Sequence, residues 1–286
     1  LLKLINELLL LDKTILERLC YIFNNRDIFN KELIDRAYNH LNSLDSSLVG
    51  KDFCLEDPII EYSPSAKGSI TDVDDVIASN GSLYQNNLYQ YRKSQHEMSK
   101  AIESSIKNQS LSIIEAGTGL GKTYAYLIPF IFASKRNNIP LVISTHTKNL
   151  QEQLFHKDIK NILKLMDIES KCMIIKGRGN YICLNKLRKL EINSSELISN
   201  FECYDLAGVV AWSFYTKSGD IEECSSFILN QNIRLWNLLK SDTKHCIKSC
   251  ASSSDCFYSI LASNIKGANL IVVNHSLLAL DAIEKR

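Results

Sequence analysis

The stretch Glu115-Ala-Gly-Thr-Gly-Leu-Gly-Lys-Thr123 decides the fold class. It follows a short apolar run at residues 111–115 and precedes an apolar helical pattern at residues 123–133. Glycines let successive backbone N–H groups converge on a phosphate, because no Cβ blocks the approach. A strand, a glycine-rich loop ending in Gly-Lys-Thr and a helix together form the P-loop pattern. An ordinary glycine-rich turn is the alternative, and it leaves the Gly-Lys-Thr ending and its two flanking elements unexplained.

The chemistry of a nucleoside triphosphate assigns roles within this loop. Lys122 is predicted to reach the β- and γ-phosphates, and the Thr123 hydroxyl to complete the coordination of Mg²⁺. Ala116 replaces the first glycine of the general pattern, which is compatible with a negative φ there. We therefore predict binding of ATP with Mg²⁺ by the following residues: Ala116, Gly117, Thr118, Gly119, Gly121, Lys122 and Thr123.

Strands and helices alternate around the loop. The pattern predicts strands at residues 111–115, 141–145, 172–175 and 269–273, with helices between them and an apolar helical stripe at residues 98–106. Strands that alternate with helices of this length form a parallel sheet covered on both faces, so the fold class is α/β. A long stretch of different composition separates the last two strands and indicates an insertion. Helices are predicted in it at residues 206–216 and 257–265.

Domain boundaries follow from these changes of composition and residue pattern. Residues 1–45 are predicted to be helical, whereas residues 56–90 have the composition of a linker. We predict a helical lead-in at residues 1–62, a linker at 63–90, a sheet domain at 91–178, an insertion at 179–266 and the continuation of the sheet domain at 267–286.

Composition excludes several classes of protein. Among 286 residues, 33 are Lys or Arg and 32 are Asp or Glu, a net charge of +1 that excludes a histone-like tail and an acidic disordered chain. There is no apolar run of about 18 residues, and residues 1–11 lack the features of a signal peptide. We therefore expect no membrane span, a cytoplasmic location and reduced thiols.

Four of the nine cysteines have the spacing of a metal site. Structural zinc usually shows paired Cys-x₂-Cys knuckles, and no such pair occurs. Three clustered thiolates and one remote thiolate suit an iron–sulfur cluster better, while zinc and unligated thiols stay open as alternatives. The four candidates are Cys183, Cys246, Cys250 and Cys256.

Two further groups indicate nucleotide and nucleic acid contacts. The Gln95 amide can donate and accept at once, which matches an adenine edge, and Arg92 could stack on the base; a solvated helix start is the alternative. Residues 135–189 carry twelve cationic and four acidic side chains, the footprint of a phosphate backbone. Within it we favour DNA contacts for Lys176, Arg178 and Tyr181, whose ring could stack a base, whereas a solvated helix face explains the lysines at 157–164 equally well.

The motifs occur in a specific order along the chain. After the phosphate loop come Val142-Ile-Ser-Thr-His-Thr-Lys-Asn-Leu-Gln-Glu-Gln-Leu154, Lys176-Gly-Arg-Gly-Asn-Tyr-Ile-Cys183, the cysteine triplet and Leu270-Ile-Val-Val-Asn-His-Ser-Leu-Leu278. In this order, over about residues 70–286, the sequence resembles the DinG helicases, bacterial relatives of the XPD iron–sulfur DNA helicases. Residues 1–55 resemble the segment that joins a DnaQ-like exonuclease domain to the helicase in fused members of the family.

The resemblance implies a RecA-like motor domain with a mainly helical [4Fe–4S] domain inserted in it. It implies ATP-driven 5′ to 3′ unwinding that acts on single-stranded and forked DNA in repair or replication. Arg92 and Gln95 then match the adenine-sensing motif, and the four candidate cysteines match the cluster ligands. Thr145, Thr147 and Gln151 fall in the motif that touches the backbone of the single strand.

The family's Asp-Glu-Ala-His box should follow residues 270–278, and the sequence stops at Arg286 without it. We therefore expect this chain alone to bind Mg·ATP weakly and to hydrolyse it negligibly. A metal-bearing DNA-binding module with nucleotide binding and no turnover is the alternative function. A P-loop nucleotide kinase is disfavoured, because no arginine-rich lid segment is present.

Overall fold

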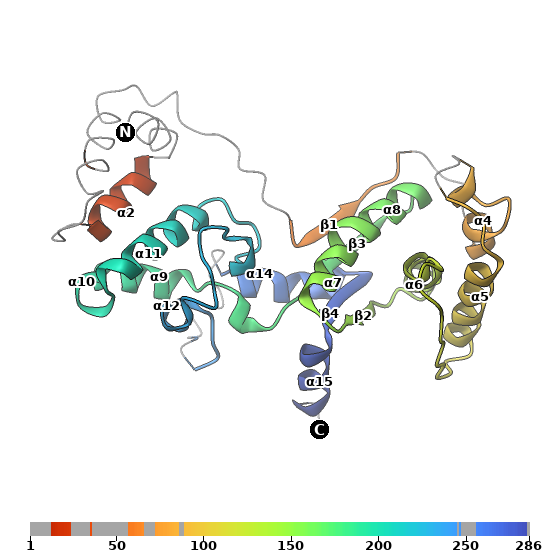
Figure 1. The fold of residues 1–286 in the computed structure, drawn as a ribbon. Coiled ribbons are helices and arrows are strands. Elements are labelled where there is room, and N and C mark those ends of the chain that lie inside the picture. The colour runs from red at the N-terminus through yellow and green to blue at the C-terminus, as the bar shows by residue number, and fades with distance from the viewer. Residues whose placement is uncertain are drawn as a thin grey trace. The chain divides into compact units, whose positions relative to one another are not determined.

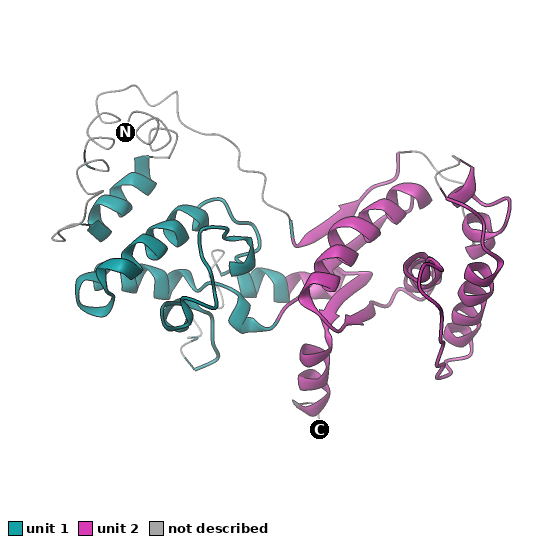
Figure 2. Ribbon diagram, viewed as in Figure 1, with its two compact units in different colours: residues 1–57, 177–262 teal, residues 58–176, 263–286 magenta. Residues whose placement is uncertain are grey.

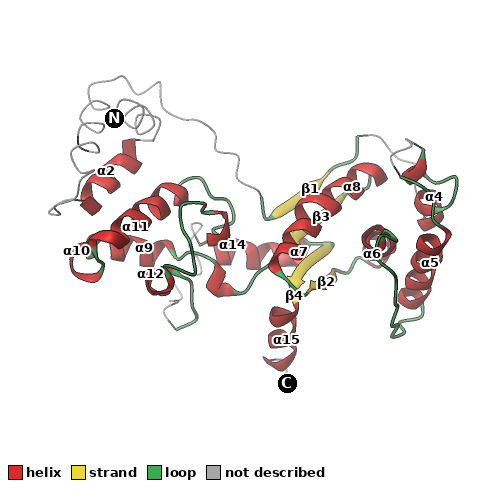
Figure 3. Cartoon of the chain, in the orientation of Figure 1, coloured by secondary structure: helices red, strands yellow, loops and turns green. Residues whose placement is uncertain are grey.

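The chain forms two compact units in the computed structural model (Figure 2). We call residues 1–57 and 177–262 the helical unit, and residues 58–176 and 263–286 the sheet unit. The structure describes residues 13–23, 35, 57–65, 72–85, 89–244, 246 and 256–284. All strands of these residues belong to the sheet unit (Figure 3). No helix in the described ranges is long and apolar enough to cross a membrane.

The sheet has the strand order β1-β3-β4-β2. Strands β2 and β3 both pair in parallel with β4, whereas β1 pairs antiparallel with β3. The strands are β1 (Ile59–Tyr62), β2 (Leu141–Thr145), β3 (Ser170–Ile174) and β4 (Leu270–Asn274). This confirms the parallel strands predicted at 141–145, 172–175 and 269–273. Residues 59–62 were predicted to belong to the helical lead-in, and instead they form the antiparallel edge strand.

The helices of the sheet unit are α4 (Val73–Ile77), α5 (Lys93–Lys107), α6 (Lys122–Asn137), α7 (Lys148–Gln153), α8 (Lys160–Met166) and α15 (His275–Glu284). Helices α7, α8 and α15 pack against the strands, whereas α4 and α5 pack against α6 (Figure 1). A π-helical turn at Leu154–Ile159 makes α7 and α8 one continuous helical segment. Phe155, Leu163 and Val272 are fully buried in the shared core of these elements.

Within the region predicted to be a linker, residues 63–90, the described residues 73–83 pack into the same core. Val73, Val76 and Ile77 of α4 are fully buried, and Leu83 follows them into the core. The Asp72 side chain caps the helix through a capping box. The linker prediction was wrong because the turn-forming residues after position 78 outweighed a short helical spacing of apolar residues at 73–77.

The strand predicted at residues 111–115 is absent from the described structure. Leu111 and Ile113 are each 94% exposed, and the run pairs with none of the four described strands. An apolar extended segment becomes a strand only when its backbone groups pair with a neighbouring chain. The prediction was wrong because it rested on the strand-favouring residues of the segment alone. A strand also needs a pairing partner, and no described strand pairs with this segment.

Helix α5 buries a polar face. The predicted apolar stripe at residues 98–106 is half-buried or exposed, whereas Gln95, Ser99 and Glu103 are buried. Gln95 and Glu103 both have partners on or beside α6. A buried polar group that has a hydrogen-bond partner avoids most of its desolvation cost, so the contact with α6 decides which face is covered.

The helical unit is built from short helices around a second core. They are α2 (Lys13–Phe23), α9 (Leu184–Ile192), α10 (Ser194–Leu197), α11 (Asn200–Ser213), α12 (Ile233–Leu239) and α14 (Phe257–Asn264). Leu16, Leu206 and Leu235 are fully buried in this core. Helices α11 and α14 confirm those predicted at 206–216 and 257–265. Of the predicted lead-in helices, only α2 and residue 35 lie in the described ranges, and the rest fall outside them.

Candidate nucleotide and DNA site

The phosphate loop has the backbone geometry that its glycines permit. Gly119 and Gly121 have positive φ values of 76° and 83°, which L side chains rarely adopt. The positions where a Cβ would stand on Gly117 and Gly119 meet no atom within 4 Å, so one side of the loop is open. Helix α6 starts immediately after Gly121, and its first N–H groups therefore face the loop.

Lys122 is held within the loop. Its Nζ donates to the carbonyl oxygens of Ala116 at 3.0 Å and of Gly117 at 3.2 Å. The ammonium charge therefore lies beside the backbone that would carry the phosphates. Thr123, the next residue, forms a side-chain hydrogen bond with Tyr126. Burial raises the pKa of Tyr126 to about 12, and the hydrogen bond with Thr123 offsets only part of that rise.

Gln95 contacts the loop directly. Its Nε2 donates to the Gly121 carbonyl oxygen at 2.8 Å, and its Oε1 accepts from the Tyr84 hydroxyl at 3.1 Å. Gln95 is 5% exposed, and a Cβ on Gly121 would overlap its amide. The amide thus joins Tyr84 to the start of α6, and the contact between Gln95 and adenine stays a prediction. Arg92 is exposed at the N-cap of α5.

Tyr84 is a residue that the sequence analysis missed. Burial raises the pKa of its hydroxyl, and the neighbouring Tyr91 hydroxyl adds to this, so Tyr84 stays a protonated donor at neutral pH. The rings of Tyr84 and Tyr91 meet edge to face at 5.5 Å. The only signal in the sequence is a tyrosine 11 residues upstream of Gln95, which is too weak to predict a contact.

The carboxyl ends of β2 and β4 bring polar side chains to one edge of the sheet. Thr145 ends β2, where it lies opposite Asn274 of β4. Its hydroxyl donates to the Thr147 carbonyl oxygen at 3.1 Å, and the Thr147 hydroxyl caps α7 by accepting from the Leu150 N–H. Ligands of open α/β sheets bind at this edge. The structure thus brings Thr145 and Thr147 together at the position where a ligand is expected.

Gln151 and Lys176 have structural partners instead. Gln151 is fully buried, and its amide donates to the backbone oxygens of Ile175 and Val272 at 2.9 and 3.0 Å. Lys176 is 2% exposed and forms an ion pair of 2.5 Å with Glu152. Burial raises the pKa of the Glu152 carboxyl, but hydrogen bonds from His156 and Lys176 outweigh it and leave the pKa lowered. The structure therefore does not support the direct DNA contacts predicted for Gln151 and Lys176.

Arg178 and Tyr181 lie in the helical unit. The Arg178 guanidinium stacks 4.0 Å from the ring centroid of Tyr258 and donates to the Asp242 carbonyl oxygen. Tyr181 is 2% exposed, and its ring packs 6.1 Å from Tyr258. A buried ring cannot stack on a base without first moving, so the base contact predicted for Tyr181 is not supported. Arg178 is half-buried and stays a candidate.

Two of the four candidate ligand cysteines, Cys183 and Cys256, lie close in sequence to residues that contact one another. The Cys183 N–H donates to the Leu239 carbonyl oxygen at 2.9 Å, and two residues before it Tyr181 packs against Tyr258, two residues after Cys256. Cys183 and Cys256 are half-buried, and Cys246 is exposed. Cys250 lies outside the described residues. The segments that carry Cys183 and Cys256 therefore meet within the helical unit.

Three of the other described cysteines are poor metal ligands. Cys172 and Cys203 are fully buried, and Cys224 nearly so. Burial raises the pKa of Cys172 to about 11 and also raises that of Cys224. A metal ligand must be a thiolate, which burial in an apolar core disfavours. These cysteines are therefore core residues.

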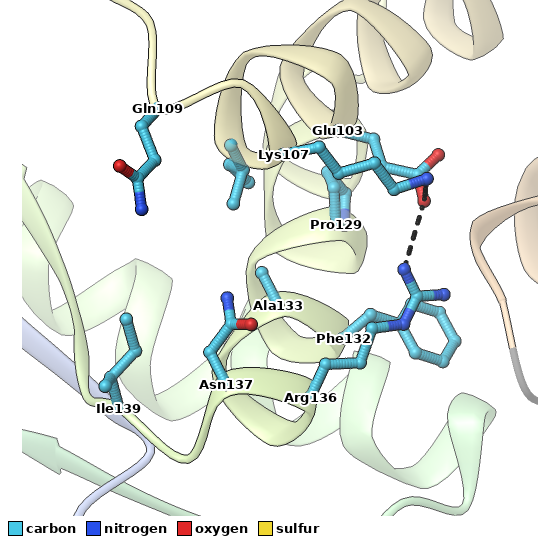
Figure 4. Close-up of a pocket in the computed structure, with 10 residues that line it drawn as sticks. Glu103, Lys107, Gln109, Pro129, Phe132, Ala133, Arg136, Asn137 and Ile139 are labelled. Carbon is cyan, nitrogen blue, oxygen red and sulfur yellow. Dashed lines mark hydrogen bonds and ion pairs between the residues drawn. The ribbon is translucent and has the colours of Figure 1, made fainter.

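A pocket of about 470 Å³ lies between α5 and α6 (Figure 4). None of its lining residues is a predicted site residue. Glu103 of α5 joins the two helices through an ion pair with Arg136 of α6 at 3.4 Å, and it also pairs with Lys107 of its own helix at 2.9 Å. Burial raises the pKa of Glu103, but its hydrogen bonds to Lys107 and Lys100 more than offset this. These charges are engaged with one another, so we assign the pocket no ligand.

The chain is similar in sequence to known helicases. A family model described as DEAD/DEAH box helicase matches residues 92–199. The chain is 35% identical over 215 residues to the ATP-dependent DNA helicase YoaA of Haemophilus influenzae, in an alignment that covers 74% of this chain and 32% of that protein. It is 30% identical over 210 residues to the ATP-dependent helicase DinG of Mycobacterium tuberculosis, covering 67% and 31%.

A third relative is named for a different activity. The 3′-5′ exonuclease DinG of Bacillus subtilis is 29% identical over 197 residues, which cover 68% of this chain and 20% of that protein. The chain thus spans a third or less of the length of each of these relatives.

Proposed function

Because the chain belongs to the DinG/YoaA family of ATP-dependent DNA helicases, we propose that it is the part of an ATP-driven DNA motor that carries the phosphate loop and a metal-cluster domain. The sheet unit is then a RecA-like motor domain. The helical unit, whose residues 177–262 interrupt the sheet unit, is the cluster-bearing insertion. The observation that carries this proposal is the geometry of the loop before α6, with Lys122 held inside it.

The loop fits the phosphates of ATP. Its open side at Gly117 and Gly119 leaves room for phosphate oxygens beside the backbone N–H groups. The Lys122 ammonium would exchange its carbonyl partners for the β- and γ-phosphates. Thr123 would supply a hydroxyl ligand to Mg²⁺, and the bound metal would neutralise charge on the phosphate oxygens. Each of these groups acts by position and charge alone.

Tyr84 and Gln95 position this loop. The Gln95 amide fixes the Gly121 carbonyl, and the Tyr84 hydroxyl fixes the other end of that amide. Gly121 has a left-handed backbone and begins the helix whose N–H groups face the phosphates. A shift of Gln95 would therefore displace the start of α6, and the Tyr84 hydroxyl acts on the loop through the Gln95 amide.

We predict that Tyr84→Phe raises the KM for ATP about fivefold with little change in kcat. The variant keeps the ring and removes one hydrogen bond, which stabilises the ordered loop by about 1 kcal/mol. The loss of this free energy weakens ATP binding by the loop and therefore raises the KM. Steady-state ATPase kinetics of the complete protein measure the effect. The matched control is Tyr62→Phe, which removes the hydroxyl bond to Asp167 on the same unit and should leave the KM unchanged. An equal KM change in both variants would contradict the positioning role.

The helical unit fits an iron–sulfur cluster by the chemistry of its donors. Cys183 and Cys256 lie in segments that meet, and Cys183, Cys246 and Cys256 are not buried in the core, in contrast to Cys203 and Cys224. Cys250 completes a set of four thiolates, the usual number for a [4Fe–4S] cluster. The cluster would cross-link the start of α9 to the segment between α12 and α14.

Single-stranded DNA is the proposed substrate at the edge of the sheet. Thr145 and Thr147 place hydroxyl groups at the carboxyl end of β2. The Thr147 hydroxyl accepts from the Leu150 N–H and can donate its own proton to a phosphate oxygen. The Thr145 hydroxyl would exchange its bond to the Thr147 carbonyl oxygen for one to phosphate. Contacts of this kind hold the strand without reading its sequence. Arg178 is a further candidate for contact with DNA in the helical unit, while Gln151, Lys176 and Tyr181 support these elements from within.

Unwinding of forked DNA tests the proposed function. The complete protein should separate a fork that has a 5′ single-stranded tail, only with ATP and Mg²⁺, and should fail on the same duplex with a 3′ tail. A gel assay of the displaced labelled strand measures this. Unwinding from the 3′ tail, or ATP hydrolysis that single-stranded DNA does not stimulate, would contradict the proposal.

A further inference from the structure

Three polar side chains that the motor's phosphate site does not use meet at the carboxyl edge of the sheet. The Ser144 hydroxyl lies 2.6 Å from His275 Nδ1, although the two residues are 131 positions apart in the sequence. The His146 ring lies 6.0 Å from the His275 ring. Both histidines are exposed and Ser144 is half-exposed. The parallel pairing of β2 with β4 brings these residues together, because it places Ser144 opposite Val273 and Thr145 opposite Asn274.

We propose that Ser144, His146 and His275 form a phosphate-binding site that adds a pH-dependent contact to single-stranded DNA. The inference rests on the proposed function, since it assumes that a DNA strand runs along this edge. His146 stands between Thr145 and Thr147 in the sequence, so the site is continuous with the hydroxyl groups proposed to hold the backbone. His275 adds a contact from the start of α15, directly after β4.

Through the hydrogen bond between Ser144 and His275, the charge of His275 determines whether the Ser144 hydroxyl is free to donate to another group. A neutral His275 whose Nδ1 accepts uses the single Ser144 proton. When His275 is protonated, its Nδ1–H must donate, and the Ser144 proton is then available to another acceptor. Protonation therefore adds one positive charge and releases one hydroxyl donor at the same place. Both changes favour a phosphate oxygen, and charge-assisted bonds to phosphate are the stronger kind.

The charged surroundings are compatible with an anion. Helices α7 and α15 both pack against β2 and β4, and among their described side chains the charged ones are Lys148, Glu152 and Asp281. Glu152 is paired with Lys176 and His156, so its charge is compensated. Lys148 follows Thr147 directly and adds a cation to the edge. Asp281 stands further along α15, in the second turn after His275.

The test compares DNA affinity at two pH values. Histidine is the side chain whose charge ordinarily changes between about pH 5 and 8. In fluorescence anisotropy with a labelled oligothymidine and no nucleotide, this chain should bind about tenfold more tightly at about pH 6 than at about pH 8 at low salt. At the lower pH, the slope of log affinity against log salt should be steeper by about 0.7 for each additional phosphate that the protein neutralises.

The double variant His146→Gln with His275→Gln should lose this pH response. The matched control His96→Gln should keep it, because His96 pairs with Asp74 beside α5 and not at this edge. Ser144→Ala should keep part of the response, since the charge remains and the hydroxyl donor is lost. Circular dichroism shows that each variant is folded.

The outcomes separate this inference from the proposed function. A wild-type chain that binds DNA equally well at both pH values overturns the inference and leaves DNA binding intact. The same conclusion follows if the double variant keeps the wild-type pH response. A chain that binds no oligothymidine at either pH overturns both the inference and the proposed DNA site.

Discussion

Replacement of Lys122 with alanine should lower the ATP turnover of the complete protein at least about a hundredfold, the usual order for loss of one preorganised charge partner. Lys122 is held at the mouth of the phosphate loop by the carbonyl oxygens of Ala116 and Gly117. Alanine leaves the backbone N–H groups in place but removes the only side-chain cation of the loop. A coupled ATPase assay with saturating single-stranded DNA measures the loss.

The matched control is Lys135→Ala. Lys135 lies near the other end of the same helix, α6, and is exposed, so its replacement should leave turnover within about twofold, as expected of an ordinary surface site. Neither variant should lose iron, because Lys122 lies in the sheet unit and the candidate cysteines in the helical unit. Substantial ATP turnover by Lys122→Ala, or loss of iron from it, would contradict the assignment.

Replacement of Cys183 with alanine should remove the cluster. Cys183 is half-buried at the N-cap of α9, and a cluster bound by three thiolates in place of four is open to solvent and to loss of iron. We expect iron content to fall from about four atoms per chain to near zero. The helical unit should also lose thermal stability, because a cross-link between distant segments is lost.

The control for this variant is Cys224→Ala. Cys224 belongs to the core of the same unit, and burial raises the pKa of its thiol, so the same substitution removes a sulfur atom that no cluster needs. Iron content should stay at the wild-type value, and stability should fall only by the small cost of a lost core atom. Loss of iron from Cys224→Ala together with its retention in Cys183→Ala would reverse the ligand assignment.

The sequence predicted those elements whose signals are local. Strands β2, β3 and β4 are short apolar runs bounded by polar residues, and α6 follows a loop whose glycines permit few other conformations. These elements depend on periodicity and on backbone freedom, and both are properties of neighbouring residues. The predicted positions of these strands differ from the observed ones by one or two residues at most.

Elements that depend on distant partners were predicted less well. Helix α5 buries its own Gln95 and Glu103 because their partners, the Gly121 carbonyl and Arg136, lie opposite them. The residue pattern alone predicts burial of the apolar face of this helix instead. Residues 111–115 have the composition of a strand but no described pairing partner. Antiparallel β1 owes its place to its pairing with β3, which a linear pattern does not contain.

The candidate site divides in the same way. The P-loop residues are consecutive, so one motif contains all of them. Tyr84 lies 11 residues from Gln95, and Ser144 lies 131 from His275, so only the fold brings these pairs together. Gln151 belongs to a motif expected to touch DNA, yet the structure uses its amide to join the backbone after β3 to β4. A motif therefore locates a functional region more securely than it assigns each side chain.

The most direct test of a cluster-bearing DNA motor is metal analysis of this chain after anaerobic purification. We expect a brown protein with broad visible absorption, about four iron atoms and about four acid-labile sulfides per chain, and no stoichiometric zinc. A colourless protein with one zinc atom, or with no metal and all nine thiols free, would contradict the proposal that the helical unit holds an iron–sulfur cluster.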